Sequence, residues 1–296
     1  MLIPEVKRVL VFVVNPAAGG SAAKECMKKL EPVLREAGIA WQTLYTERAG
    51  HATELAAAAA SREDCEAVIS VGGDGTAYEV AAGLLGSGKP MGIIPSGTGN
   101  DFIKSLNYPK DPVAALRLIL KRELKPVDLV SLNERCFLNV TGTGFDVTVL
   151  QQAEKYRGRL KGLLPYLLGL LKALRVFRPV RIGLELDGVY SEREALICAV
   201  ANGRYIGGGI PICPAARPDD GLLDVVLVNS VPRWRTPFYV PGLLMGRVLR
   251  WRVTEHVRCR SVRITGRDMF VQIDGEITRM EEAAMRVLPG QLMLYR

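Results

Sequence analysis

The fold is decided by the stretch Ala67-Val68-Ile69-Ser70-Val71-Gly72-Gly73-Asp74-Gly75-Thr76, in which an apolar run ends in a glycine-rich loop. Residues 67–71 are mostly β-branched or apolar and predict a buried strand, and residues 76–85 predict a helix. Glycine lets backbone N–H groups come close to an anion, and the N-terminus of the following helix adds a partial positive charge. The stretch therefore predicts a strand, an anion-binding loop and a helix in succession.

The same order of elements repeats on both sides of this stretch, because short β-branched runs alternate with longer helical stretches up to about residue 128. Strand, helix and strand in succession imply right-handed crossovers and a parallel sheet, whose ligands bind beyond the carboxyl ends of the strands. The predicted strands are Val9–Val14, Trp41–Tyr45, Ala67–Val71 and Met91–Ile94. The predicted helices are 21–37, 51–61 and 76–85.

Three of the four predicted strands end in glycine-rich loops that lead into helices, which favours a cradle for a polyphosphate. Glycine after a strand is also ordinary turn chemistry, but three such loops at one sheet edge make that explanation the weaker one. The Rossmann spacing is absent, and a Walker-like string near Lys89 has Pro90 where Ser or Thr is required. The three loops are residues 15–20, 72–76 and 95–101.

After Asp128 the sequence changes to apolar runs joined by Gly, Asp and Pro turns, which predicts a mainly antiparallel β half with two inserted helical stretches. The pairs Asp187-Gly188 and Asp274-Gly275 each stand between alternating apolar residues and predict hairpin turns. We therefore expect an α/β nucleotide-binding domain over residues 1–128 and a β-rich sandwich domain over 129–296, with the option that the last strand returns to the first domain. The predicted strands of this half include 181–187, 194–201, 222–228, 261–265 and 269–274.

The composition of the 296-residue chain is that of an ordinary folded protein, with 48% hydrophobic and 24% charged residues. A net charge of +8 favours anionic partners, while 6% aromatic residues and glycine loops at strand ends argue against nucleic-acid binding. The six cysteines are scattered, and no histidine stands at a metal-like spacing from them, which argues against a zinc site and favours a reducing cytosol. We expect neither a signal peptide nor a membrane span, because no apolar run reaches about 20 residues.

Motifs along nearly the whole chain resemble the diacylglycerol-kinase catalytic family, and most closely its soluble bacterial lipid kinases. That family is related to sphingosine and ceramide kinases, and more distantly to NAD kinases and phosphofructokinases. Seven matching motifs occur in the family's order, which makes the resemblance specific. They are residues 15–16, 71–76 with Glu79, 94–101, 141–146, 201–205 with 207–209, 214–216 with 220–224, and 274–276.

The resemblance implies a first domain similar to those of phosphofructokinases and NAD kinases, a lipid-binding second domain, and ATP with magnesium (Mg2+) bound between them. It implies phosphorylation of a hydroxyl of a neutral lipid, first of all diacylglycerol, giving phosphatidic acid. Asp74 would act near the phosphates, where a carboxylate requires magnesium or a hydrogen-bond donor between itself and the nucleotide. The implied nucleotide contacts are Asn15, Pro16, Ala17, Ala18, Gly19, Thr46, Gly73, Asp74, Gly75, Thr76, Ala77, Tyr78, Glu79 and Thr98.

Asp274 and Glu276 are the family's candidates for the base that accepts the proton of the lipid hydroxyl. Asp274-Gly275 is also the pattern of a plain type I′ turn, as Asp187-Gly188 shows within the same chain. The resemblance, and Glu276 at the position where the other turn has Val189, favour a catalytic role. Which of the two carboxylates accepts the proton stays open.

A second, structural magnesium site is implied by the resemblance of residues 217–224 to a loop of the bacterial relatives. Its ligands would be the carboxylate of Asp220 and the backbone carbonyls of Arg217 and Leu222. The alternative is an acidic surface turn before a strand.

Two stretches combine apolar and basic residues in a way that suits an anionic membrane surface: 161–178 and 234–251. For the first stretch, a helix packed on the β half is the stronger alternative and is also what the family resemblance implies. We expect a cytoplasmic enzyme in peripheral contact with an anionic membrane. Two other functions remain as alternatives, an NAD kinase-like enzyme and a non-catalytic binder of nucleotide and lipid, and the sequence is silent on the oligomeric state.

Overall fold

The computed structural model describes residues 8–20, 22–156 and 164–296, which form two compact units. The first unit holds the described residues up to Leu129 together with Pro289–Arg296, and the second is Val130–Leu288. The chain passes between the units inside two long strands, β5 (Leu124–Leu132) and β13 (Glu276–Tyr295). The end of the chain thus belongs to the unit in which the chain begins.

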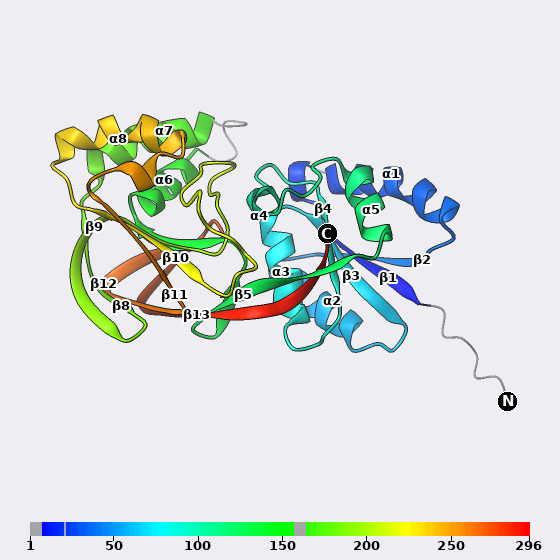
Figure 1. Ribbon diagram of the computed structural model, residues 1–296. Coiled ribbons are helices and arrows are strands. Elements are labelled where there is room, and N and C mark those ends of the chain that lie inside the picture. The colour runs from blue at the N-terminus through cyan, green and yellow to red at the C-terminus, as the bar shows by residue number, and fades with distance from the viewer. Residues whose placement is uncertain (1–7, 21, 157–163) are drawn as a thin grey trace. The chain divides into compact units, whose positions relative to one another are not determined.

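The first unit is a parallel sheet covered by helices on both faces (Figure 1). Its strands lie in the order β4-β3-β1-β2, and α1 and α5 cover one face while α2 and α3 cover the other. β3 is buried along nearly its whole length, which is why its sequence is an almost continuous apolar run. The elements are β1 (Val9–Val14), α1 (Ala22–Glu36), β2 (Ala40–Tyr45), α2 (His51–Ala60), β3 (Cys65–Gly72), α3 (Asp74–Leu84), β4 (Met91–Pro95), α4 (Asp101–Ser105) and α5 (Pro112–Leu120).

The predicted α/β class of this half is confirmed, and the predicted strands and helices end within two residues of the observed ones. The prediction omitted α5, although the sequence carries a signal for its start. Asp111 accepts a hydrogen bond from the backbone N–H of Ala114 at 2.8 Å, and Pro112 occupies the first helical position. Both are common at helix N-termini.

The second unit is built on antiparallel strands whose two faces belong to two different cores. Along β9, Cys198 and Val200 join a core shared with β8, β12 and β13, while Ile197 and Ala199 join a core under helices α6, α7 and α8. This alternation confirms the predicted β-rich class. The elements are β6 (Arg135–Phe137), β7 (Val140–Gly144), α6 (Phe145–Glu154), α7 (Leu164–Val176), β8 (Val180–Leu186), β9 (Val189–Ala201), β10 (Leu223–Asn229), α8 (Thr236–Leu244), β11 (Thr254–Cys259) and β12 (Ser261–Ile273).

Two predictions for this unit need correction. The stretches 261–265 and 269–274, predicted as separate strands, belong to the single strand β12, whose register shifts between Thr265 and Met269. The stretch 234–251 is not one helix, because α8 is short and 3-10 turns lie on either side of it, at Arg233–Arg235 and Val248–Arg250. Pro241, inside α8, lacks the N–H donor that a longer regular helix would need.

In the other stretch proposed to face a membrane, 161–178, residues 161–163 lie outside the described residues. From Leu164 to Val176 the stretch is helical, as expected. No helix in the described parts of the chain is long and apolar enough to cross a membrane.

Candidate functional site

The loops after β1, β3 and β4 meet at one edge of the first unit's sheet. The backbone N–H of Asn15 donates to the carbonyl of Val71 at 3.0 Å, and that of Ser96 donates to the carbonyl of Gly72 at 2.8 Å. The N–H of Thr46, after β2, donates to the carbonyl of Val14 at 2.9 Å. The strands' parallel register therefore brings these four predicted nucleotide-binding segments to one place.

Two of the loops approach each other more closely than any side chain would allow. A Cβ added at Gly97 would lie 2.4 Å from Cα of Gly73 and 3.0 Å from its nitrogen. Position 97 therefore requires glycine, because only a residue without a side chain lets the two backbones come this close. Beside this contact, a Cβ at Gly75 would meet no atom within 4 Å, so α3 has open space at Gly75 in its first turn.

This arrangement fits a phosphate chain. The first turn of α3, where Gly75 is exposed, offers backbone N–H groups that the helix itself does not use, and a helix N-terminus attracts negative charge. The hydroxyl of Ser96 is buried and has no hydrogen-bond partner among the described residues. A buried hydroxyl without a partner is costly, so an oxygen-rich ligand at this edge would satisfy it.

Asp74 links the second and third loops. Its Oδ1 accepts a hydrogen bond from the backbone N–H of Phe102, at the start of α4, at 3.1 Å. Burial raises the pKa of Asp74, while the amides of Asp101 and Phe102 act in the opposite direction. Asp101 in turn forms an ion pair with Lys104 at 2.8 Å. Both carboxylates thus have donors within the first unit. That magnesium or a donor stands between Asp74 and a nucleotide stays a prediction.

Other predicted nucleotide contacts have structural partners. Both carboxylate oxygens of Glu79 accept backbone N–H groups at the start of α2, from Gly50 at 3.0 Å and Ala52 at 3.1 Å. The side chain of Asn15 accepts the N–H of Ala17 at 3.0 Å and shapes the first loop. Thr46 and Thr76 are buried, while Thr98 is exposed. The loop geometry therefore depends on Glu79 and Asn15, and their contact with a nucleotide stays a prediction.

In the second unit, Asp274 and Gly275 form the two-residue turn between β12 and β13, with φ angles of 46° and 95°. Positive φ at both positions is the type I′ geometry. The carboxylate of Asp274 accepts three backbone N–H groups at the start of β7, from Leu138 at 2.9 Å, Asn139 at 3.1 Å and Val140 at 3.0 Å. The turn is thereby fastened to the neighbouring strand.

Glu276 follows this turn and is exposed, and its backbone is paired with that of Ile273 across the hairpin. A carboxylate has about four acceptor positions. Asp274 uses three of them on backbone N–H groups, whereas the carboxylate of Glu276 faces solvent. The arrangement gives Glu276 the greater freedom to accept a proton.

Asp146 is a buried carboxyl of the second unit that the sequence analysis named only as part of a motif. It lies in the first turn of α6, its side chain is buried, and neither carboxylate oxygen has a partner among the described residues. Burial raises its pKa to about 6. The available signal was the position of Asp146, directly after Gly144-Phe145 at the start of a helix. An acidic residue is common in a first helical turn, so this position alone did not indicate that the carboxyl is buried.

In the predicted structural magnesium loop, both carboxylate oxygens of Asp220 already have partners. Oδ1 of Asp220 accepts the N–H of Leu222 at 3.2 Å, and Oδ2 is paired with the guanidinium of Arg258. Asp220 offers the oxygen ligand that magnesium prefers, and the guanidinium of Arg258 would compete with the ion for this carboxylate. The ligand set Arg217, Asp220 and Leu222 remains a prediction, and no step below depends on it.

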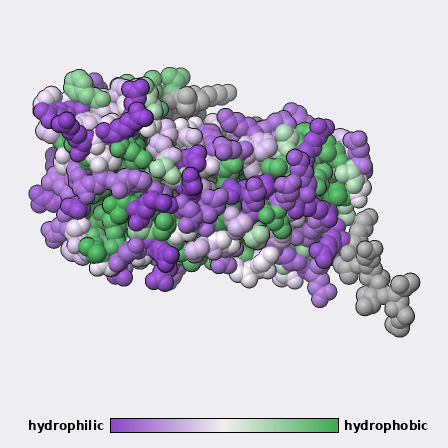
Figure 2. Space-filling view, in the orientation of Figure 1, coloured by the Kyte–Doolittle hydropathy of each residue, from purple (hydrophilic) through white to green (hydrophobic). Residues whose placement is uncertain are grey.

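Helices α7 and α8 expose apolar side chains among basic ones, and Figure 2 shows the two kinds interspersed over this end of the unit. Leu170, Leu174 and Phe177 of the α7 region pack onto the core, as the alternative for this stretch predicted. A second set stays exposed: Leu164, Leu167, Leu171, Val176, Trp234, Phe238, Leu244 and Met245. Exposed basic residues nearby in the sequence are Lys172, Arg175, Arg178, Arg233, Arg235, Arg247 and Arg250.

Comparisons with known proteins cover nearly the whole chain. The Diacylglycerol kinase catalytic domain family matches residues 9–132, and the YegS C-terminal NAD kinase beta sandwich-like domain matches residues 139–296. A diacylglycerol kinase of Mycobacterium tuberculosis is 30% identical over 292 residues, 95% of this chain and 93% of that protein. A protein of Enterobacter sp. (strain 638), named a probable lipid kinase, YegS-like, is 32% identical over 93% of this chain and 92% of its own.

The crystal structure of a diacylglycerol kinase from Bacillus anthracis str. Sterne has the same fold, with a TM-score of 0.73 and 27% identity. The match covers 98% of this chain and 96% of that one. The glycine loops of the first unit and the Asp-Gly-Glu turn of the second fall inside the two matched domains. The chain therefore belongs to the diacylglycerol kinase catalytic family and is a kinase.

Proposed function

We propose that this kinase transfers the γ-phosphate of ATP to the hydroxyl of a neutral membrane lipid, with diacylglycerol as the leading substrate and phosphatidic acid as the product. The observation that carries the proposal is the meeting of three loops at one sheet edge, with the Gly73 and Gly97 backbones in direct contact. The names of the relatives support a lipid acceptor, since those proteins are called diacylglycerol kinase or lipid kinase.

The nucleotide-binding role of the first unit follows from its free backbone donors. The N–H groups of the first turn of α3, starting at Gly75, would hold phosphate oxygens, and the hydroxyl of Ser96 would add a donor. Bound magnesium would neutralise charge on the phosphates during transfer, and Asp74 is the carboxylate at this edge that would hold it. Asp74 also keeps α4 in place through Phe102, so it orients the loop that carries Thr98.

The proton of the lipid hydroxyl requires an acceptor, and we assign that role to Glu276. Its carboxylate is exposed, and it is held at the end of a rigid turn. Asp274 is the positioning residue, because its three backbone hydrogen bonds fix the turn that carries Glu276. A general base of this kind contributes roughly 10²- to 10⁴-fold to a rate.

The test of the nucleotide site is the variant Gly75→Val. A Cβ added at Gly75 would meet no atom within 4 Å, so the fold should be retained while the valine side chain covers the amides of α3. Isothermal titration should show that ATP binding is lost. Unchanged ATP affinity in a normally folded variant would remove the loops from the mechanism.

The test of the substrate is incubation with labelled ATP and mixed micelles that contain diacylglycerol, monoacylglycerol, ceramide or sphingosine, with NAD in a separate reaction. We expect the label in phosphatidic acid. Label in NAD would favour the NAD kinase-like alternative, and no label in any acceptor would favour the non-catalytic binder. Glu276→Gln serves as the control, since it should bind ATP and transfer the label on the order of 10²-fold or more slowly.

We also propose that the exposed apolar and basic side chains of α7 and α8 bind the surface of an anionic membrane. Each Lys or Arg near such a surface contributes about 1 kcal/mol, and the attraction weakens beyond roughly 8 Å at physiological salt. Apolar residues such as Phe238, 76% exposed, and Trp234, 67% exposed, would add insertion into the headgroup region. This contact would bring the enzyme to a substrate that stays in the bilayer.

Vesicle flotation tests the membrane surface. Binding should be stronger to vesicles with anionic lipid than to neutral ones, should fall with added salt, and should be lost with Phe238→Asp. Val189→Asp is the matched control, because Val189 is 73% exposed on the hairpin between β8 and β9 and carries no membrane role. Equal loss in both variants, or equal binding to neutral vesicles, would contradict the proposal.

A further inference from the structure

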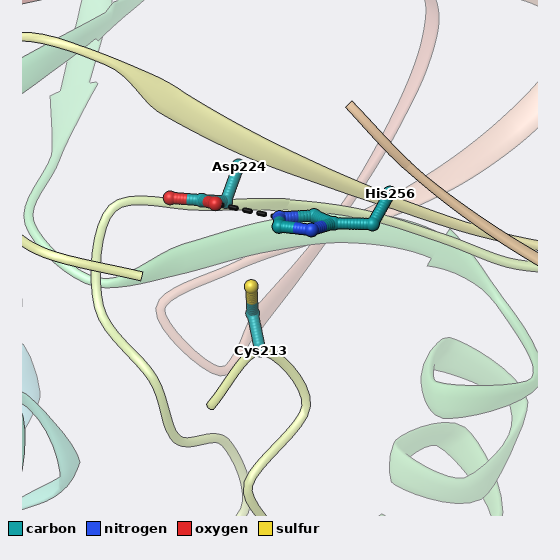
Figure 3. A group of neighbouring side chains, drawn as sticks. All are labelled: Cys213, Asp224 and His256. Carbon is teal, nitrogen blue, oxygen red and sulfur yellow. Dashed lines mark hydrogen bonds and ion pairs between the residues drawn. The ribbon is translucent and has the colours of Figure 1, made fainter. Parts of the chain in front are cut away.

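The second unit contains a cluster of three metal-ligating side chains that the kinase reaction does not use. The ligand atoms of Cys213, Asp224 and His256 all lie within 4.8 Å of one another. They come from the loop between β9 and β10, from β10 and from β11, respectively. Figure 3 shows the sulfur of Cys213 pointing toward the hydrogen-bonded pair of Asp224 and His256.

Asp224 is the buried centre of this cluster. Its side chain is only 1% exposed, and Oδ1 lies 2.6 Å from Nε2 of His256 and 3.7 Å from Nε of Arg258. Oδ2 is fully buried and has no hydrogen-bond partner among the described residues. A buried carboxylate oxygen without a donor is costly, so its natural complement is a cation in the cluster.

Cys213 is a buried thiol beside this carboxylate. Burial raises its pKa to about 12, and Asp224 acts in the same direction, while the backbone amides of Ala215 and Ala216 favour the thiolate. Amides directed at the sulfur would stabilise it as a metal-bound thiolate.

We propose that Cys213, Asp224 and His256 form a binding site for a zinc ion, in which the metal joins the β9–β10 loop to β10 and β11. A thiolate, a carboxylate and an imidazole are the ligands that zinc accepts together, whereas magnesium and calcium prefer oxygen alone. The two anionic ligands balance the charge of the ion. His256 is partly exposed, so water can complete the coordination from that side.

The geometry requires only small movements. Ligand atoms around tetrahedral zinc stand roughly 3.5 Å apart, given bonds of about 2.0 to 2.3 Å. The present separation of Asp224 and His256 is shorter and the largest separation in the cluster is at most 4.8 Å, so side-chain rotation suffices. Sequence spacing could not reveal the site, because its residues lie on three separate segments that only the sheet brings together.

The site has a structural consequence for the unit. Cys213 precedes the loop that contains Asp220, and this loop is held to β11 by the pair of Asp220 and Arg258. Zinc would add a second attachment of the same segment to the same strand. We expect it to raise the stability of the unit, and the proposal is independent of the assigned substrate.

The experiment uses the full-length chain after dialysis against a chelator. Titration with zinc, and with cobalt as a spectroscopic probe, should show one site per chain, and cobalt should give a thiolate charge-transfer band in the near ultraviolet. Magnesium in large excess should not compete. Zinc should also raise the temperature of thermal unfolding.

His256→Gln should weaken zinc binding by at least the roughly 100-fold that loss of an outer-shell partner can cost, and Cys213→Ala should abolish the charge-transfer band. The controls are His51→Gln, which changes the only other histidine, and Cys26→Ala, a buried cysteine of the first unit. His256 is partly exposed, so its variant should fold. Absence of zinc binding by the parent chain, equal loss in His51→Gln, or displacement of zinc by magnesium would overturn the proposal.

Discussion

Two hairpin turns of the second unit share nearly every feature except the function proposed for one of them. Asp187-Gly188 joins β8 to β9 and Asp274-Gly275 joins β12 to β13, with φ angles of 46° and 87° in the first and 46° and 95° in the second. In both turns the aspartate accepts backbone N–H groups of an adjacent segment. Asp187 binds Arg260 at 3.0 Å and Ser261 at 2.8 Å, much as Asp274 binds the start of β7.

The comparison teaches that aspartate in this turn is a backbone clamp, whether or not the turn does chemistry. What differs is the residue after the glycine, which is Val189 in one turn and Glu276 in the other. The surroundings also differ, since Asp187 is exposed and Asp274 is half-buried beside β7. The chemical role proposed for the second turn therefore belongs to Glu276, and the role of Asp274 is to position it.

The largest expected effect comes from replacing Glu276, the residue by which the two turns differ. Glu276→Gln should lower kcat on the order of 10²-fold or more while leaving KM for ATP and the unfolding temperature nearly unchanged, because only the proton acceptor is lost. Asp187→Asn, in the matched turn, should leave kcat unchanged. Steady-state kinetics of both variants give the answer, and near-normal turnover by Glu276→Gln would make the second turn structural.

The next effect tests the clamp. Asp274→Ala leaves three backbone N–H groups of residues 138–140 without their charged acceptor and should cost on the order of 3 kcal/mol of unfolding free energy. Asp187→Ala should cost roughly 1 kcal/mol, because its turn is exposed and water replaces the carboxylate. Urea unfolding measures both. Equal costs would mean that burial of the second turn contributes nothing.

The two turns also show how far sequence reasoning reached. The pairing of Asp and Gly between alternating apolar residues was enough to predict both hairpins, since few residues adopt positive φ. The partners of the two aspartates could not be predicted, because Asp274 binds residues 134 to 136 positions earlier in the chain. Local patterns specify turns, whereas tertiary pairing decides what a carboxylate touches.

The same limit explains the other results. The glycine loops of the first unit were located because parallel strands bring their carboxyl ends to one edge, a rule of topology that sequence order reveals. The return of the last strand to the first domain was expected only as an option, and the bounds of β13 were not predicted, since it contains Pro289 and Gly290, which weaken a strand pattern. The zinc site proposed at Cys213, Asp224 and His256 could not be inferred from the sequence for a related reason, because the spacing of these residues matches no metal motif.

The carboxyl of Asp146, also in this unit, should make the stability of the protein fall as pH rises, because its pKa is raised. Asp146 has no partner among the described residues, and its pKa is raised to about 6. Its contribution to stability is complete below the ordinary pKa of 3.8 and is lost as pH rises through about 6, a change of roughly 3 kcal/mol. Asp146→Asn should remove this part of the pH dependence in urea titrations at pH 4 and pH 7. An unchanged profile would show that the carboxyl has a partner in solution.

The smallest expected effect separates the shape of the turns from their chemistry. Gly188→Ala and Gly275→Ala each force alanine into a positive φ, and in neither case would the new Cβ meet an atom within 4 Å, so strain is the only cost. Both variants should lose about 1 to 2 kcal/mol of stability, and the two losses should agree. Only Gly275→Ala should also lower kcat, by several-fold, because the strain moves Glu276 relative to the residue it pairs with across the hairpin, Ile273. If both variants lowered kcat equally, the loss would reflect global stability, and the second turn would have no special place in the reaction.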